Sequence, residues 1–90
     1  MQEKELERKL AVAVKRAGGL ALKFVSPGYA GVPDRLVLLP GGVAIFVEVK
    51  APGMKPRPLQ MRRHRVLRRP GFKVYMLDDV SQIGAVLEGV

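Results

Sequence analysis

Apolar residues recur at helical spacing near the start of the chain and at strand spacing in the segments that follow. Between residues 3 and 17 the apolar positions on one helical face are Leu6, Leu10, Ala13, Val14 and Ala17. This spacing predicts an amphipathic helix that ends at Gly18-Gly19. Residues 20–25 then predict a strand, because apolar side chains alternate along them.

Two apolar, β-branched runs over residues 35–39 and 43–50 are separated by a Pro-Gly-Gly turn at residues 40–42. Turn residues between two such runs predict a β-hairpin. If all three residues form the loop, Asp34 lies directly opposite Glu48. A two-residue loop would shift the register by one and would still leave the two carboxylates as neighbours.

The second half of the chain predicts a helix over residues 58–69, a strand over 72–77 and a short final helix capped by Asp78 or Asp79. The apolar positions of these helices are Leu59, Val66 and Leu67 in the first and Val80, Ile83, Val86 and Leu87 in the second. The element order is therefore α-β-β-β-α-β-α. We expect a single α/β domain over residues 1–90, with a sheet flanked by helices.

Composition excludes several classes of protein. The 90 residues include no cysteine, which excludes a disulfide framework and a thiolate zinc site. No apolar run approaches the ~20 residues that cross a bilayer, so we expect no membrane partner. Residues 1–9 are polar and lack the apolar segment of a secretory signal. We therefore expect an intracellular, cytoplasmic protein.

The charge of the chain indicates an anionic partner. Sixteen Lys and Arg residues stand against eight Asp and Glu residues, which gives a net charge of +8. Such a balance favours nucleic acid. Between Arg8 and Leu77 the only acidic residues are Asp34 and Glu48. A surface that binds DNA avoids carboxylates, so these two need a separate explanation.

The candidate catalytic residues lie where the strands of the predicted hairpin end. Side chains alternate along residues 43–50, so Glu48 and Lys50 share a face, and Asp34 joins them from the paired strand. Two carboxylates and an ammonium group suit a hard cation such as Mg²⁺ and a water beside it. The alternative is a simple ion-pair cluster. That alternative gives no reason for these to be the only acidic residues in the middle of a basic chain.

The same residues carry a resemblance to a known family. Pro33-Asp34 followed by Glu48-Val49-Lys50 matches the PD-(D/E)xK nuclease signature. Further matching segments are residues 18–23, 31–35, 40–42, 46–50, Gln60 and 71–75. Together they resemble the VRR-NUC family in its small stand-alone form, over nearly the whole chain. The resemblance implies a restriction-endonuclease-like domain with a mixed sheet, related to Holliday junction resolvases.

The resemblance also implies roles for individual residues. It assigns Asp34, Glu48 and the backbone carbonyl of Val49 as ligands of Mg²⁺, with Mn²⁺ as a substitute. Lys50 would orient or activate the attacking water. Phosphodiester hydrolysis needs a metal ion and the stabilisation of negative charge at the scissile phosphate.

Three more residues enter through the resemblance. The family places a metal-binding glutamate in the first helix, for which we favour Glu7 and keep Glu3 as the alternative. Gln60 resembles a glutamine that supports the active site in related nucleases. One turn after Gln60, His64 stands where those relatives have tyrosine, and we expect it to be a solvated side chain.

The long acid-free stretch from Lys50 to Lys73 predicts a phosphate-binding surface. The candidate DNA-binding residues are Arg35, Lys55, Arg57, Arg62, Arg63, Arg65 and Tyr29. We expect a Mg²⁺-dependent endonuclease that cuts four-way (Holliday) junctions or related branched DNA. The resemblance and the small core imply a homodimer and fit a phage or prokaryotic setting. The alternative is a non-catalytic basic module that binds DNA or RNA.

Overall fold

The computed structural model describes residues 1–88, so the last two residues of the predicted domain lie outside it. Its elements are α1 (Glu3–Arg16), β1 (Leu20–Lys23), β2 (Arg35–Leu39), β3 (Val43–Val49), α2 (Pro58–Arg68), β4 (Lys73–Leu77), a 3₁₀ helix η1 (Val80–Gln82) and α3 (Ile83–Glu88). This order confirms the predicted succession of helices and strands. None of the helices within residues 1–88 has the length and apolar character that a bilayer crossing requires.

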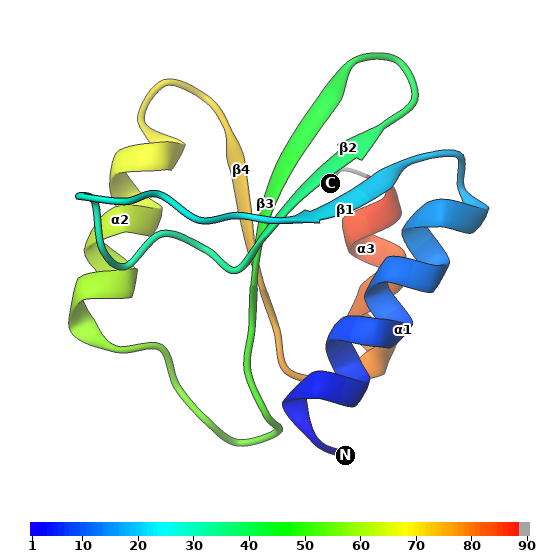
Figure 1. The fold of residues 1–90 in the computed structure, drawn as a ribbon, viewed down its shortest axis with the longest axis horizontal. Helices are drawn as coiled ribbons and strands as arrows, with labels where there is room; N and C mark the ends of the chain where they lie inside the picture. The colour runs from blue at the N-terminus through cyan, green and yellow to red at the C-terminus, as the bar shows by residue number, and fades with distance from the viewer. Residues whose placement is uncertain (89–90) are drawn as a thin grey trace.

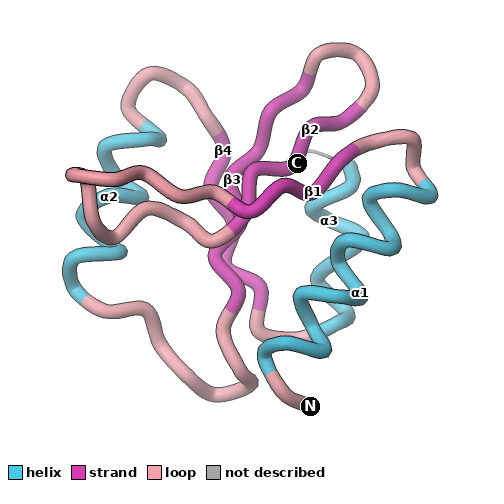
Figure 2. The backbone as a smooth tube through the Cα atoms, viewed as in Figure 1, coloured by secondary structure: helices cyan, strands magenta, loops and turns pink. Residues whose placement is uncertain are grey.

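The four strands form one mixed sheet in the order β1-β2-β3-β4. Strand β2 is antiparallel to both β1 and β3, and β4 runs parallel to β3. Helices α1 and α3 cover one face of the sheet, while α2 lies on the other face (Figures 1 and 2). The molecule therefore has three layers, and side chains that alternate along a strand face different helices.

The main core lies between the sheet and helices α1 and α3. Leu6, Leu10 and Val14 of α1 are fully buried and pack against Ile45 and Val47 of β3. The predicted apolar stripe of the first helix is correct at these positions. It is wrong at Ala17, which is exposed because the helix ends at Arg16 and the chain turns there.

The hairpin between β2 and β3 has the predicted three-residue loop. Leu39 pairs with Val43, and Arg35 pairs with Val47. Gly41 and Gly42 both have positive φ, of 88° and 77°, a conformation that glycine adopts without steric cost. This register carries Asp34, directly before β2, to the position opposite Glu48 on β3.

Helix α2 buries polar residues, which corrects the prediction for its face. Gln60 and His64 are 5% and 2% exposed, whereas Val66, predicted to be buried, is 37% exposed. His64 was expected to be solvated, and that expectation is wrong. The reason lies on the opposing strand, because the sheet presents the carboxyl group of Glu48 to this helix and a buried carboxyl group requires polar partners.

Two element ends also differ from the prediction. Strand β1 ends at Lys23, two residues early, and Val25 is 77% exposed in the loop that follows. The final helix begins as the 3₁₀ turn η1 with Asp79 as its N-cap. That tight turn leaves Val80 exposed while Ile83 and Val86 are buried as predicted.

Candidate functional site

The hairpin brings the carboxyl groups of Asp34 and Glu48 together at the end of the sheet. Asp34 comes directly before β2, and its Oδ2 accepts a hydrogen bond of 2.9 Å from the backbone N–H of Val49. The charge of Asp34 is one of the influences that raise the pKa of Glu48, so the two carboxyl groups are close enough to interact electrostatically.

Glu48 is the buried member of this pair. Its side chain is fully shielded from solvent. Burial, followed by the proximity and charge of Asp34, raises the pKa of Glu48 from its ordinary value of 4.5 to about 8, while Lys50 opposes the rise. A carboxyl group in this state takes up positive charge readily, either as a proton or as a cation.

Lys50 lies on the same face as Glu48, as predicted from strand alternation. Its Nζ is 3.5 Å from Glu48 Oε2, and its side chain keeps 19% of its exposure. The side chain of Lys50 therefore contacts the buried carboxyl group and is also partly accessible from solvent. From this position it can interact with a ligand that approaches the carboxylates.

Gln60 holds Glu48 in a fixed orientation. Its Nε2 donates a 3.0 Å hydrogen bond to Glu48 Oε2, and its Oε1 accepts one of 2.8 Å from the backbone N–H of Arg57. Because Arg57 N–H occupies the acceptor end of the amide, the donor end must face Glu48. The start of α2 thus fixes the orientation of a side chain on β3.

His64 is the second residue of α2 at this site, one turn after Gln60. Its Nε2 is 3.5 Å from Glu48 Oε1. Burial, together with the charge of Arg68, lowers the pKa of His64 below its ordinary value. The imidazole is therefore neutral at pH 7, and its contact with Glu48 is not an ion pair. The spacing of four residues from Gln60 was the sequence signal for this position.

The structure fits a divalent cation at Asp34 and Glu48. Glu48 Oε1 is buried and has no hydrogen-bond partner. An unpaired buried carboxyl oxygen next to a second carboxyl group offers the hard oxygen ligands that Mg²⁺ binds. Within residues 1–88 no group of three or more Asp, Glu or His side chains is placed to hold a metal ion. Backbone carbonyls, waters or substrate would complete the coordination.

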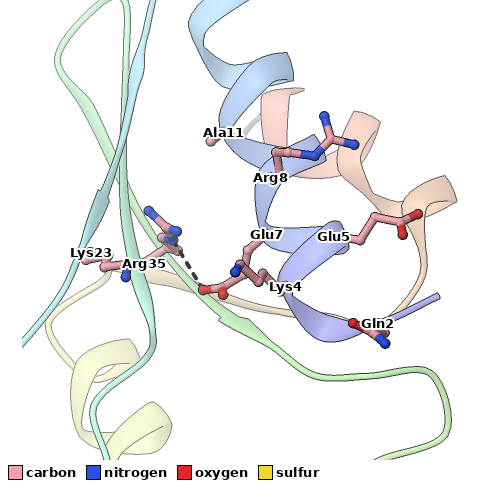
Figure 3. A pocket seen from close by; sticks show the side chains of 8 residues that line it. All are labelled: Gln2, Lys4, Glu5, Glu7, Arg8, Ala11, Lys23 and Arg35. Atoms are coloured by element: carbon pink, nitrogen blue, oxygen red, sulfur yellow. Dashed lines mark hydrogen bonds and ion pairs between the residues drawn. The ribbon is translucent and has the colours of Figure 1, made fainter.

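The glutamates of α1 have other partners or are exposed. Glu7 forms an ion pair of 3.4 Å with Arg35, on the face of the sheet that α1 covers (Figure 3). Glu3 is exposed. Neither has a contact with Asp34 or Glu48 among the described residues. The resemblance favoured Glu7 over Glu3 as a metal-binding residue, but the sequence could not identify Arg35 as its partner.

The predicted DNA-binding residues fall into three groups. The side chains that are exposed on or before α2 are Lys55, Arg57, Arg62 and Arg65. Arg63 is tied to the loop between β1 and β2, because its Nε donates to Ala30 O at 2.8 Å and its Cζ lies 3.9 Å from the centroid of the Tyr29 ring. Arg35 lies on the other face of the sheet.

Comparisons with known proteins agree on one kind of relative. The chain is 53% identical over 85 residues to "Putative nuclease p44" of Acyrthosiphon pisum secondary endosymbiont phage 1, which covers 92% of this chain and 91% of that protein. A solved structure described as a VRR_NUC domain matches with a TM-score of 0.88 and 36% identity, covering 96% of this chain and 94% of the other. A comparison with protein-family models gives no match.

Proposed function

Because the chain belongs to the VRR-NUC family, we propose that it is a metal-dependent endonuclease that hydrolyses phosphodiester bonds in structured DNA. Nuclease activity is supported by the fold and by the name of the phage relative. The metal, the DNA structure and the roles of individual residues are proposals that rest on the site described above.

One observation carries the proposal. A fully buried carboxyl group, Glu48, lies beside the carboxyl group of Asp34 and 3.5 Å from the ammonium group of Lys50 in an otherwise basic chain. A buried, partly unsatisfied carboxyl pair is costly to the fold. A catalytic use of the pair explains why the chain retains it.

Asp34, Glu48 and the backbone carbonyl of Val49 would hold Mg²⁺, and Mn²⁺ would substitute for it. When bound there, the ion would polarise the scissile phosphate and lower the pKa of a bound water. Gln60 keeps Glu48 Oε2 in place, and the N–H of Val49 keeps Asp34 Oδ2 in place. These contacts orient the ligands before any ion arrives, which reduces the cost of reorganisation.

Lys50 is the other residue of this chain for which we propose a role in catalysis. Its ammonium group, on a side chain partly accessible from solvent, would donate a hydrogen bond to the attacking water or to a phosphate oxygen. In either position it would stabilise negative charge that develops in the transition state. Glu7, with Glu3 as the alternative, stays a proposed further ligand from α1, and its carboxylate pairs with Arg35 in this structure.

The substrate class follows from charge. Exposed basic side chains on and before α2 lie on the same side of the sheet as Glu48 (Figure 1). They would bind phosphates rather than bases, which favours recognition by shape. We propose branched DNA, with four-way junctions first, and a homodimer that places two active sites on one substrate.

The test compares a four-way junction with linear duplex of the same sequence, each with Mg²⁺ and with chelator. We expect incision of the junction with Mg²⁺, none with chelator, and none by Asp34→Ala. Binding of DNA or RNA without metal-dependent incision would overturn the enzyme and favour a non-catalytic binding module.

A further inference from the structure

Tyr29 differs from the other aromatic residues of the protein in what surrounds its ring. The chain has two Tyr, three Phe and no Trp, all within the described residues. The phenylalanine rings pack into one cluster, with centroids 5.4 and 5.8 Å apart: Phe24, Phe46 and Phe72. The hydroxyl group of Tyr75 is buried. Tyr29, in the loop between β1 and β2, is 37% exposed, and its ring packs on a cation.

That cation is the guanidinium group of Arg63, which fixes the ring from α2. Arg63 Cζ lies 3.9 Å from the centroid of the ring, and Arg63 Nε donates a 2.8 Å hydrogen bond to Ala30 O. The backbone N–H of Tyr29 donates one of 3.1 Å to Ser26 O, which closes the turn that presents the ring. The guanidinium group covers one face of the ring. A ring that is already fixed loses little freedom when a ligand stacks on its exposed part.

The ring lies close to the carboxyl pair, because the loop and Glu48 contact the same two turns of α2. Arg63 contacts the loop, while Gln60 and His64 contact Glu48. An α-helix with its side chains is about 10 Å across, and one strand of DNA rises about 3.4 Å per nucleotide, so the ring is within reach of a base about three nucleotides from a phosphate at Glu48.

Free base faces distinguish branched DNA from a linear duplex. Inside a duplex, each base pair is covered on both faces by its neighbours. At an open branch point, the last base pair of an arm has lost one neighbour and offers a free face. Aromatic side chains stack on such faces without selecting a sequence, because every base has a π face. An exposed, fixed tyrosine ring near the cleavage site is suited to that contact.

We propose that Tyr29 stacks on the base face that a branch point exposes, and that Arg63 positions the ring for this contact. The proposal rests on the proposed function and deepens it, since it names the feature by which the protein distinguishes branched DNA from duplex. The exposed basic side chains of α2 bind phosphates of either form. Tyr29 adds affinity for the branched form alone.

The first test measures the preference for branched DNA. Binding of a labelled four-way junction is compared, in chelator, with binding of a linear duplex whose ends are closed by loops and so offer no free base face. Tyr29→Leu keeps an apolar side chain without a ring, and should bind the junction about tenfold more weakly and the duplex within about twofold of the wild type. Tyr29→Phe should retain the preference. An undiminished preference in Tyr29→Leu would overturn the proposal.

Two further variants separate the ring from the loop that carries it. Val25, 77% exposed in the same loop, is the matched control, and Val25→Ala should leave both affinities unchanged. Arg63→Lys keeps the charge but loses the planar group over the ring, and should lower the preference several-fold. An unchanged preference in Arg63→Lys would contradict its positioning role. A loss in Val25→Ala equal to that in Tyr29→Leu would mean that the ring itself is not what binds the branch point.

A second test locates the contact. The fluorescent base 2-aminopurine, whose emission falls when it stacks, is placed singly at each position around the branch point. At one position we expect lower emission in complexes with the wild type and Tyr29→Phe than with Tyr29→Leu. Absence of such a position would contradict the assignment. Because all readouts use chelator, a wild type that shows this signal but never cuts with Mg²⁺ would overturn the nuclease and leave the stacking site intact.

Discussion

Glu48 is held in a protonated state by its surroundings when no cation is bound. Burial and the neighbouring Asp34 raise its pKa to about 8 from an ordinary value of 4.5. In the unfolded chain the carboxyl group of Glu48 is neither buried nor close to Asp34. The folded protein therefore keeps a proton on Glu48 over a range of pH in which the unfolded chain has released it.

This difference predicts how stability depends on pH. The contribution of Glu48 is fully present below about pH 4.5 and is lost as pH rises through about 8. His64, whose pKa is lowered, adds a slope of the opposite sign that fades as pH rises above its ordinary value of 6.5. Between pH 6.5 and 8, in chelator, the free energy of unfolding should fall with pH by up to about 1.4 kcal/mol per unit.

Urea denaturation of the wild type and of Glu48→Gln provides the comparison. Glutamine preserves the shape of the side chain and cannot ionise, so its curve should be flat over the same range. A wild type whose stability rises between pH 6.5 and 8 would show that Glu48 is ionised in the fold.

Lys50 gives a second prediction at the residue scale. Because its ammonium group contacts Glu48 and its side chain is partly accessible from solvent, Lys50→Ala should lower kcat by about 10²-fold or more. Binding of the junction in Ca²⁺ should change by less than about threefold, since one charge is removed. Arg62→Ala, on the exposed side of α2, is the matched control and should weaken binding while kcat is kept. Cleavage at the wild-type rate by Lys50→Ala would remove this residue from the mechanism.

At the scale of elements, the loop between β1 and β2 docks on α2. The loop extends from the sheet to this helix (Figure 1), where Arg63 binds Ala30 O and stacks on Tyr29. Gly31 makes the closest approach, since an added Cβ would lie 2.8 Å from Leu59 Cγ. The loop ends at Asp34, and α2 carries Gln60, which donates a hydrogen bond to Glu48. The contact between loop and helix therefore influences the position of Asp34 relative to Glu48.

Gly31→Ala should therefore destabilise the fold more than a glycine change without contacts. Gly28 is the matched control, because it also has positive φ, of 80° against 90°, and a Cβ there meets nothing within 4 Å. Both variants carry the backbone cost, and the steric contact should add about 1–3 kcal/mol to Gly31→Ala alone. Chemical denaturation measures the difference. Equal destabilisation would mean that the loop is not docked through Gly31.

The elements themselves could be predicted because their signals are local. Alternation predicted β2 and β3, and the Pro-Gly-Gly turn left two registers, both of which make Asp34 and Glu48 neighbours; the structure has the one that sets them opposite each other. Only neighbours along the hairpin were needed for that inference. Strand alternation likewise placed Lys50 on the face of Glu48.

The surroundings of that pair could not be predicted, because they depend on segments far apart in sequence. The resemblance pointed to Gln60, but His64 looked like a solvated position on a basic helix, and it is buried because Glu48 faces it. Glu7 was favoured over Glu3 through the resemblance, but its partner Arg35 is 28 residues away in the sequence. In both cases the hydrophobic pattern carries no information about which polar groups meet.

At the scale of the whole molecule, one sheet face is left partly uncovered. On the side of α2, Leu20 and Leu22 of the edge strand β1 are 56% and 44% exposed, and Phe72 is 47% exposed. Phe46 joins the rings of Phe24 and Phe72 into one apolar surface. An uncovered edge strand with apolar side chains favours association.

We predict that this surface contributes to the proposed homodimer. Analytical ultracentrifugation of the wild type should show a dimer, and Leu22→Lys should shift it toward monomer by burying a charge at the interface. Val12→Lys, an exposed apolar residue of α1 on the other face, is the matched control and should leave the dimer intact. A monomeric wild type, or equal effects of the two variants, would contradict this prediction.

The central claim, that Asp34 and Glu48 jointly hold a divalent cation, is tested most directly by calorimetric titration with Mn²⁺ at pH 7.5 in the absence of DNA. The wild type should bind Mn²⁺ and release a proton from the carboxyl pair, detected as a dependence of the heat on the buffer. Asp34→Asn, which retains an acceptor for the N–H of Val49, and Glu48→Gln should each weaken binding at least about tenfold. Unchanged Mn²⁺ affinity in both variants would contradict the claim.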